Sequence, residues 1–178
     1  MRIISGYLKG KKIDLPKDNL TRPLKDMVKE SIFNIIYHSK NFNFKIKGAK
    51  VLDLFSGSGS FGLECISRGA EKVTFNENYK NAIEILEKNI KKLDCIKKSE
   101  ILETDCFQLS KKFDQKVDLI FMDPPFKEKN INQLLILIQK MKILKKRGLI
   151  IIHRNRKEEE NFIESLNILD IRYYGLSK

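Results

Sequence analysis

The fold of this chain is decided by residues 51–62, which read VLDLFSGSGSFG. A short apolar run meets a group of glycines, and a helical pattern containing Leu63 and Ile66 then continues to Gly69. A strand, a glycine turn and a helix in this order present backbone N–H groups and the positive end of a helix to a nucleotide-like ligand. Glycine permits the tight turn and lets a ligand approach the backbone closely.

The glycine pattern alone does not identify the ligand. Gly57, Gly59 and Gly62 also satisfy the G-x-G-x-x-G fingerprint of dinucleotide-binding proteins. Asp53 argues against a simple dinucleotide-binding motif, because a buried strand does not carry an unpaired carboxylate without a reason. A nicotinamide-dependent oxidoreductase remains an alternative, but it leaves this aspartate without a role.

Beyond this stretch, the chain alternates between strand and helix patterns. The predicted strands are 51–55, 72–76, 99–103, 117–122, 148–153 and 167–174, and the predicted helices are 60–68, 79–93, 106–112, 129–145 and 157–165. Such alternation predicts an α/β, Rossmann-like fold, with a mostly parallel sheet and helices on both faces. In sheets of this kind, ligands bind at the carboxyl ends of the strands.

Four acidic residues follow or end successive predicted strands. Asp53 precedes the glycine turn, and Glu77 lies 20 residues beyond Gly57, where a ribose-binding carboxylate is expected. Asp105 follows the third strand, and Asp123 follows the fourth. Each could be an ordinary surface carboxylate, but their shared position at the strand ends predicts a site.

The fourth strand runs into residues 123–126, which read DPPF. Two prolines remove two backbone donors and fix the direction of the chain, leaving an acidic side chain and carbonyl groups as acceptors. Acceptors suit an exocyclic NH₂ group, which offers two donors, and an aromatic ring beside them can stack on a flipped base. The structural alternative is a proline-terminated strand followed by a helix-capping aspartate.

The amino-terminal region is strongly basic. The net charge is +12, and the first 50 residues hold twelve Lys/Arg against four Asp/Glu. Residues 2–15 predict a small β-hairpin and residues 24–39 a helix, so residues 1–45 are interpreted as a basic, nucleic-acid-binding extension of a main domain over residues 46–178. The lysines at the hairpin turn would grip phosphates without reading sequence, although a solvated basic surface would have the same composition.

The composition argues against several other classes of protein. Cys65, Cys95 and Cys106 show no C-x-x-C spacing, which indicates reduced thiols in a cytoplasmic protein. Two histidines offer few ligands for a metal, and no apolar run approaches the roughly 18 residues of a membrane span. We expect a monomer with no metal and no membrane partner. Residues 153–156 contain one histidine and two arginines, interpreted as a solvated basic turn rather than an extended RNA surface.

Residues 51–62 resemble the cofactor motif of class I S-adenosylmethionine-dependent methyltransferases, and residues 123–126 resemble the D/N-P-P-F/Y motif of the amino-methylating branch. Over nearly its whole length, the chain is similar to the RsmD family, bacterial 16S rRNA guanine-N2 methyltransferases. The matching pieces are RIISG at 2–6, TRP at 21–23, LDLFSGSG at 52–59, SRGA at 67–70 and FMDPPF at 121–126. The resemblance implies a target guanine in 16S rRNA of the small ribosomal subunit.

The resemblance also assigns roles to residues. The cofactor-binding residues it implies are Asp53, Gly57 and Gly59 at the methionine end, Glu77 at the ribose hydroxyls and Asp105 at the adenine, together with Phe55. The catalytic residues it implies are Asp123, Pro124, Pro125 and Phe126, with Asp123 and the Pro124 carbonyl receiving the guanine amine. The RNA-binding residues predicted from the basic amino-terminal region are Arg2, Lys9, Lys11 and Lys12, and the resemblance adds Arg22, at the RNA or at the rim of the site.

Two departures from the family are visible. Asn76 and Tyr79 flank Glu77 where the family runs apolar-Glu-x-Asp, which predicts a different local pocket. The family also continues beyond a segment like 173–178 into a last strand, so we expect that strand to be missing and the fifth strand to lack a neighbour. An amino-methyltransferase acting on DNA adenine and a catalytically weak RNA-binding homologue therefore remain alternatives.

Overall fold

The computed structural model describes residues 1–18, 24–111, 113–158 and 162–178. Its strands are β1 (Lys50–Leu54), β2 (Lys72–Glu77), β3 (Ser99–Glu103), β4 (Val117–Met122) and β5 (Leu144–Ile152). Its α-helices are α1 (Asp26–His38), α2 (Ser60–Ser67), α3 (Lys80–Lys92) and α4 (Ile131–Met141), and its 3₁₀ helices are η1 (Ile96–Lys98) and η2 (Cys106–Lys111). The strands and helices predicted from residue 24 to β4 are thus present, with the 3₁₀ helix η2 where a helix over 106–112 is predicted.

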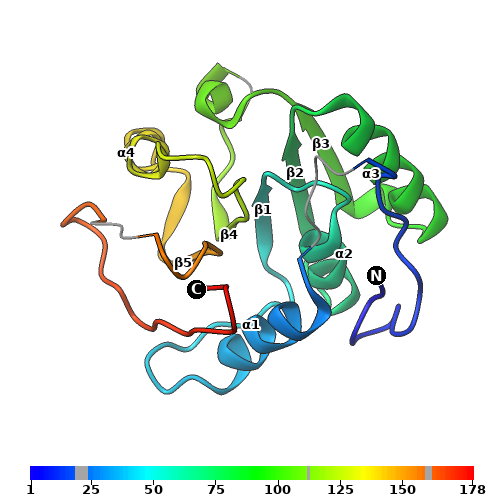
Figure 1. Ribbon diagram of the computed structural model, residues 1–178, viewed down its shortest axis with the longest axis horizontal. Coiled ribbons are helices and arrows are strands. Elements are labelled where there is room, and N and C mark those ends of the chain that lie inside the picture. The colour runs from blue at the N-terminus through cyan, green and yellow to red at the C-terminus, as the bar shows by residue number, and fades with distance from the viewer. Residues whose placement is uncertain (19–23, 112, 159–161) are drawn as a thin grey trace.

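The strands form one parallel sheet in the order β3-β2-β1-β4-β5 (Figure 1). The chain moves outward from β1 to β3 and then crosses back to place β4 on the other side of β1. Ligands in open parallel sheets bind where the strand order reverses in this way. In this protein that point lies between the carboxyl ends of β1 and β4, where the glycine turn and residues 123–126 begin.

Alternate residues of each central strand face opposite sides of the sheet. Val51 of β1 belongs to the hydrophobic core beneath α1, α2 and α3, whereas Leu52 belongs to the core beneath η2 and α4. The buried residues of α4 recur at helical spacing: Ile131, Leu134, Leu135 and Ile138. Helices therefore cover both faces of the sheet, as the sequence predicts.

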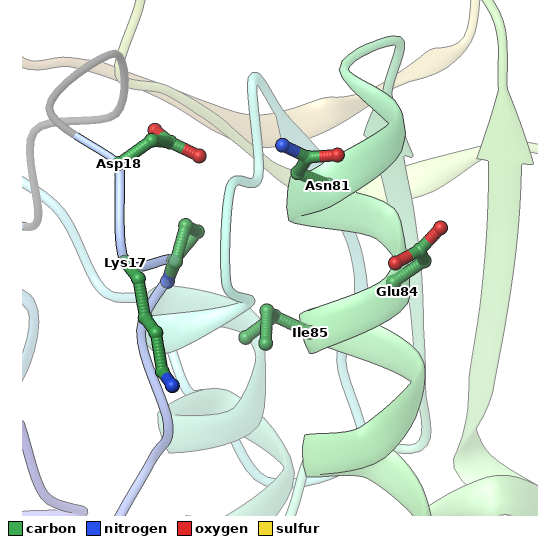
Figure 2. Close-up of a pocket in the computed structure, with 6 residues that line it drawn as sticks. Lys17, Asp18, Asn81, Glu84 and Ile85 are labelled. Carbon is green, nitrogen blue, oxygen red and sulfur yellow. The ribbon is translucent and has the colours of Figure 1, made fainter.

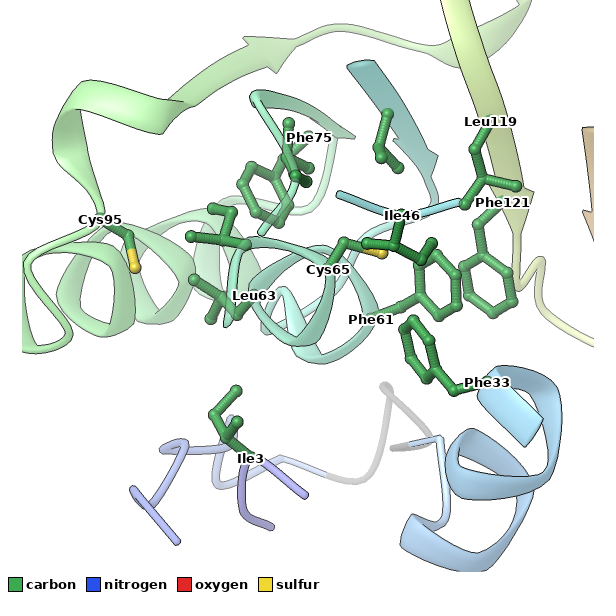
Figure 3. Packing of buried hydrophobic residues seen from close by; sticks show 14 of the residues in the cluster. Ile3, Phe33, Ile46, Phe61, Leu63, Cys65, Phe75, Cys95, Leu119 and Phe121 are labelled. Carbon is green, nitrogen blue, oxygen red and sulfur yellow. The ribbon is translucent and has the colours of Figure 1, made fainter. Parts of the chain in front are cut away.

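The amino-terminal segment shares the core of the main sheet. Its predicted hairpin is reduced to one antiparallel bridge between Arg2 and Lys12. Ile3 is buried with residues of α2 and β4, and Phe61 of α2 stacks on Phe121 of β4 with 3.8 Å between ring centroids (Figure 3). Phe33 of α1 extends the stack at 5.1 Å from Phe61. Helix α1 is consequently packed against the sheet, not merely tethered to it.

A buried carboxylate fixes this segment to α2. Glu64 accepts hydrogen bonds from the backbone N–H groups of Ile4 (2.7 Å) and Ser5 (2.9 Å) and from Nε of Arg68 (2.8 Å). The Lys29 ammonium lies 3.7 Å from the same carboxylate, and both side chains have no exposed surface. Burial lowers the pKa of Lys29. A buried charge is tolerated only when paired and hydrogen-bonded, so this cluster defines how α1, α2 and the amino terminus fit together.

The boundary between α4 and β5 differs from the prediction. The helix ends at Met141 rather than at residue 145, because Lys142 adopts a left-handed conformation (φ 53°). Strand β5 then begins at Leu144, beside Val117. The register shifts before Leu119, which pairs with Leu149. Leu144 lies three residues after Met141 and seven after Leu137, so the helical spacing of apolar residues continues into the lysine-rich start of β5.

The two predictions beyond β5 are wrong. Residues 157–158 and 162–165 form no helix, and residues 167–174 form no strand. Ile168, Ile171 and Tyr173 are about half exposed, so no strand among the described residues covers the apolar side chains that predicted a strand here. In Figure 1 this orange-to-red segment loops away from β5 and returns near it at the carboxyl terminus. A groove of about 1270 Å³ lies between β5, α1 and this segment.

Candidate functional site

The glycine turn after β1 uses unusual backbone conformations. Phe55 has a φ of 58°, Gly57 of 53° and Gly59 of 81°. A left-handed conformation at a non-glycine residue stores strain, which concentrates at functional sites. A Cβ atom on Gly57 would meet no atom of the described residues within 4 Å, whereas one on Gly59 would lie 2.4 Å from Leu86. The first glycine therefore opens a cradle for a ligand, and the second allows the turn to pack on α3.

Asp53 supports the turn from within the sheet. Its Oδ2 accepts a hydrogen bond of 2.9 Å from the backbone N–H of Gly62, in the first turn of α2. The side chain is 1% exposed, and burial raises its pKa well above the ordinary value. The charges of Asp123 and Glu77 raise the pKa further, and the hydrogen bond from Gly62 opposes them. Three acidic groups from β1, β2 and β4 are therefore close enough to influence one another.

Glu77 ends β2 and reaches the glycine turn. Its Oε2 accepts a hydrogen bond from the N–H of Gly57 at 2.7 Å, and its Oε1 accepts from Asn78 (2.9 Å) and Tyr79 (3.0 Å). The carboxylate thus lies directly beside the cradle at Gly57. Glu77 closes β2, as the sequence predicts, and its role at the ribose stays a prediction.

The next acidic residue, Asp105, is exposed beyond β3. Its Oδ1 accepts a hydrogen bond from the N–H of Phe107 at 2.9 Å, which begins η2. Asn76 braces this region, because its amide donates to the carbonyls of Leu102 (3.1 Å) and Thr104 (2.8 Å). Asn76 is 1% exposed and so supports the strand ends instead of lining a pocket.

Asn89 of α3 is a supporting residue that the sequence did not reveal. It has no exposed surface, and its Nδ2 donates to the carbonyls of Ser58 and Asp14, each at 3.0 Å. Its Oδ1 accepts from the N–H of Asp14 at 2.9 Å. One amide therefore ties the glycine turn, α3 and the amino-terminal segment together. A buried asparagine on the apolar face of an amphipathic helix is the signal that could have identified it.

The residues after β4 form a corner beside the glycine turn. The N–H of Asp123 donates to the carbonyl of Leu54 at 3.4 Å, so the corner starts next to the end of β1. Pro124 is buried, Phe126 is half-buried and Pro125 is exposed. The Pro125 carbonyl accepts from the N–H of Glu128 at 2.9 Å, which turns the chain back. The corner and the turn therefore lie at the same end of neighbouring strands.

The predicted solvated turn after β5 is wrong for two of its three residues. His153 is 4% exposed and Arg154 is 2% exposed. Nδ1 of His153 lies 2.8 Å from Oδ1 of Asp123, and the Arg154 guanidinium donates to the carbonyl of Glu128 at 2.7 Å. Both side chains face the corner after β4. The parallel register of β4 and β5 explains this, but the sequence pattern alone does not define that register.

The predicted RNA-binding residues lie on the amino-terminal segment. Lys9, Lys11 and Lys12 are exposed, and Arg2 forms an exposed ion pair of 3.9 Å with Asp26. The nearby residues 7 and 8 bond to Ser67, the last residue of α2, whereas the glycine turn precedes the first residue of α2. The lysines are therefore near the end of α2 opposite the turn. Arg22 lies outside the described residues.

A hollow of about 440 Å³ lies outside the sheet, next to the start of α3 (Figure 2). Lys17 and Asp18 approach from the amino-terminal segment, and Asn81, Glu84 and Ile85 from α3. Tyr79 joins these walls, because its hydroxyl donates to Asp18 (3.0 Å) and accepts from Asn81 (2.9 Å). The hollow does not include the glycine turn. Tyr79 therefore links the amino-terminal segment to the start of α3 beside the hollow.

Two further features were sought in the parts of the chain that the structure describes. No group of three or more histidine, cysteine, aspartate or glutamate side chains is arranged to hold a metal ion there. No described helix is both long and apolar enough to cross a membrane.

A five-stranded parallel sheet, a glycine turn at its switch point and acidic residues at successive strand ends define the class I methyltransferase fold. Over residues 1–178 the sequence matches the family described as Conserved hypothetical protein 95, and the chain belongs to this family, that of ribosomal RNA small subunit methyltransferase D. The enzyme of that name from Haemophilus influenzae is 33% identical over 179 residues, covering 99% of this chain and 90% of its own length.

Other similarities agree with this membership. Ribosomal RNA small subunit methyltransferase D of Buchnera aphidicola from Baizongia pistaciae is 37% identical over 166 residues, covering 93% of this chain and 79% of its own length. The solved structure "Putative methyltransferase yhhF from Escherichia coli" superimposes with a TM-score of 0.84 at 25% identity, covering 99% of this chain and 93% of that one.

Proposed function

We propose that this protein transfers a methyl group from S-adenosylmethionine to the exocyclic N2 amine of a guanine in 16S rRNA of the small ribosomal subunit. The observation that carries the proposal is the position of Asp123 at the end of β4, beside the glycine turn at the end of β1. The names of the relatives in the same family support rRNA as the substrate. The guanine amine is supported by the DPPF motif.

The residues around the turn fit a cofactor of this kind. The cradle at Gly57 has room for a ligand at the point where a Cβ would project. Asp53, Phe55, Gly57 and Gly59 would hold the methionine end, Glu77 the ribose hydroxyls and Asp105 the adenine. When bound, S-adenosylmethionine supplies a methyl group on a positively charged sulfur.

The corner after β4 would prepare the amine. The lone pair of a base amine is delocalised into the ring, so the amine is a weak nucleophile until its hydrogens are held out of the plane. The Asp123 carboxylate and the Pro124 carbonyl would accept those hydrogens. Pro125 fixes the corner, and Phe126 would stack on the flipped base. Holding the reacting atoms in line can contribute up to about 7–11 kcal/mol in ideal cases.

RNA would be held mainly through its phosphates. Arg2, Lys9, Lys11 and Lys12, with Arg22, supply positive charge on the amino-terminal region, over residues 1–45, and such contacts position RNA without reading its sequence. Residues 46–178 would form the catalytic part. We further infer a cytoplasmic monomer acting without a metal. The lysines lie near the last residue of α2, whereas the glycine turn precedes its first residue. A large substrate, such as a ribosomal particle, would contact both the lysines and the glycine turn.

The experiment is methyl transfer from labelled S-adenosylmethionine to small-subunit particles. Asp123→Ala should abolish transfer while leaving the cofactor affinity measured by calorimetry unchanged. Asp114→Ala is the matched control, because Asp114 is an exposed carboxylate in the loop before β4. Unchanged turnover in Asp123→Ala would refute the proposed role. Transfer to adenine in DNA would favour the alternative amino-methyltransferase, and RNA binding without cofactor affinity would favour a catalytically weak homologue.

A further inference from the structure

We propose that His153, at the end of β5, is a positioning residue for the reaction: its ring holds the Asp123 carboxylate in the orientation that receives the substrate amine. This inference rests on the proposed function of Asp123. The carrying observation is the 2.8 Å contact between Nδ1 of His153 and Oδ1 of Asp123.

The backbone places the histidine for this contact. The N–H of His153 donates to the carbonyl of Met122 at 2.9 Å, which extends the β4–β5 pairing one residue beyond the strand ends. Because the strands are parallel and in register, His153 and Asp123 leave the sheet side by side. The histidine side chain is 4% exposed and the aspartate side chain 14% exposed. The contact is therefore shielded from water, where a hydrogen bond to a carboxylate is strongest.

The surroundings of the ring indicate which nitrogen carries the proton. Nε2 of His153 is buried and has no hydrogen-bond partner among the described residues. A buried N–H without a partner costs more than a buried acceptor without one. The arrangement that avoids an unpaired donor is a neutral ring with its proton on Nδ1, donated to Asp123. In this arrangement, Asp123 remains an ionised acceptor for the substrate amine.

Arg154 supports the same corner from its other side. Its guanidinium donates to the carbonyl of Glu128 at 2.7 Å and lies 3.4 Å from the carbonyl of Pro125. Its backbone pairs with Lys178 through hydrogen bonds of 2.7 and 2.8 Å. Directly after β5, His153 thus holds the side chain of Asp123, and Arg154 holds the loop that follows Asp123.

The first test is a set of variants assayed for methyl transfer and cofactor binding. His153→Leu should lower kcat roughly 100-fold, the loss typical of a reacting group displaced by about 1 Å. The cofactor Kd should not change, because the hydrogen bonds of His153 go to Asp123 and Met122, on the β4 side of the site. His153→Asn should recover most of the lost turnover, since its amide nitrogen can replace Nδ1 as the donor. His38→Leu is the matched control, because His38 is exposed at the end of α1.

The second test reads the proton directly and does not depend on activity. The chain has two histidines, so His38→Leu assigns the two imidazoles in a two-bond ¹H–¹⁵N correlation spectrum. We expect His153 to carry its proton on Nδ1 alone in the wild-type protein. A proton on Nε2 alone would overturn the proposal, and this reading stands even if His153→Leu does not fold.

The outcomes separate this inference from the proposed function. If Asp123→Ala is inactive while His153→Leu turns over like the wild type, Asp123 keeps its role and the positioning role of His153 is refuted. If Asp123→Ala is itself fully active, the proposed function of the corner fails. If His153→Asn is as impaired as His153→Leu, the donated hydrogen bond is not what His153 contributes.

Discussion

Replacing Glu64 by glutamine tests how the amino-terminal segment is held. The substitution keeps the shape of the side chain but removes the charge that faces Lys29 and Arg68 inside the protein. It also places an NH₂ group where the N–H groups of Ile4 and Ser5 need an acceptor. We therefore expect Glu64→Gln to lower the free energy of unfolding substantially.

The structure sets the magnitude of this loss. Removing one partner of a buried ion pair costs about 3–5 kcal/mol. We expect the lower end of this range, because both cations keep a stabilising contact without the Glu64 charge. Lys29 is also 3.8 Å from Asp26, and Arg68 is slightly exposed and lies over the Phe33 ring. A loss of about 3 kcal/mol corresponds to a decrease in Tm of roughly 6–12 °C for a domain of this size.

The assay is urea unfolding followed by circular dichroism, with thermal unfolding alongside. Glu87→Gln is the control, because Glu87 is exposed and pairs with Lys91 one turn along α3. That change should cost only about 0.5 kcal/mol or less. The double variant Glu64→Gln/Lys29→Met should recover part of the loss, since it removes one of the uncompensated cations. Equal stability of Glu64→Gln and Glu87→Gln would refute the reasoning.

Three further predictions concern the site. Because the pKa of Asp53 is raised, the folded state holds the Asp53 proton more tightly than the unfolded state does. The stability that this proton contributes is present below the unfolded pKa of 3.8 and is lost as the pH rises through the folded pKa. Urea unfolding at several pH values should therefore show Asp53→Asn gaining stability over the wild type as the pH increases, and a constant difference would contradict this. Glu77→Ala should weaken cofactor binding in calorimetry, and equal affinity would remove Glu77 from the site. Replacing Lys9, Lys11 and Lys12 by glutamine should reduce the slope of log affinity for RNA against log salt by roughly 0.7 per lysine, and an unchanged slope would show that these lysines do not contact phosphates.

The sequence predicted the central part of the fold because its signals are local. Residues 51–62 combine an apolar run, three glycines and a helix start, and each of these features specifies backbone conformation directly. The strand ends after β2 and β4 were predicted for the same reason. The acidic residues at these ends could be grouped because the ends of parallel strands share one edge of the sheet.

The errors lie where long-range packing decides the structure. The apolar spacing of residues 167–174 is that of a strand, but a strand forms only when another strand accepts its hydrogen bonds. The helix predicted to residue 145 ends at Met141, because residues from Leu144 onward pair with β4. His153 and Arg154 looked like a solvated turn, since nothing in their own segment shows that β4 ends beside them. These features become visible only in the register of β4 and β5.

The most direct measurement is nucleoside analysis by mass spectrometry after incubation with labelled S-adenosylmethionine and small-subunit particles from cells that lack the enzyme. The expected result is label in a single N2-methylguanosine of 16S rRNA, absent when Asp123→Ala replaces the wild-type protein. Label on another base, or on DNA but not on the particles, would contradict the assignment of the guanine amine to the corner after β4.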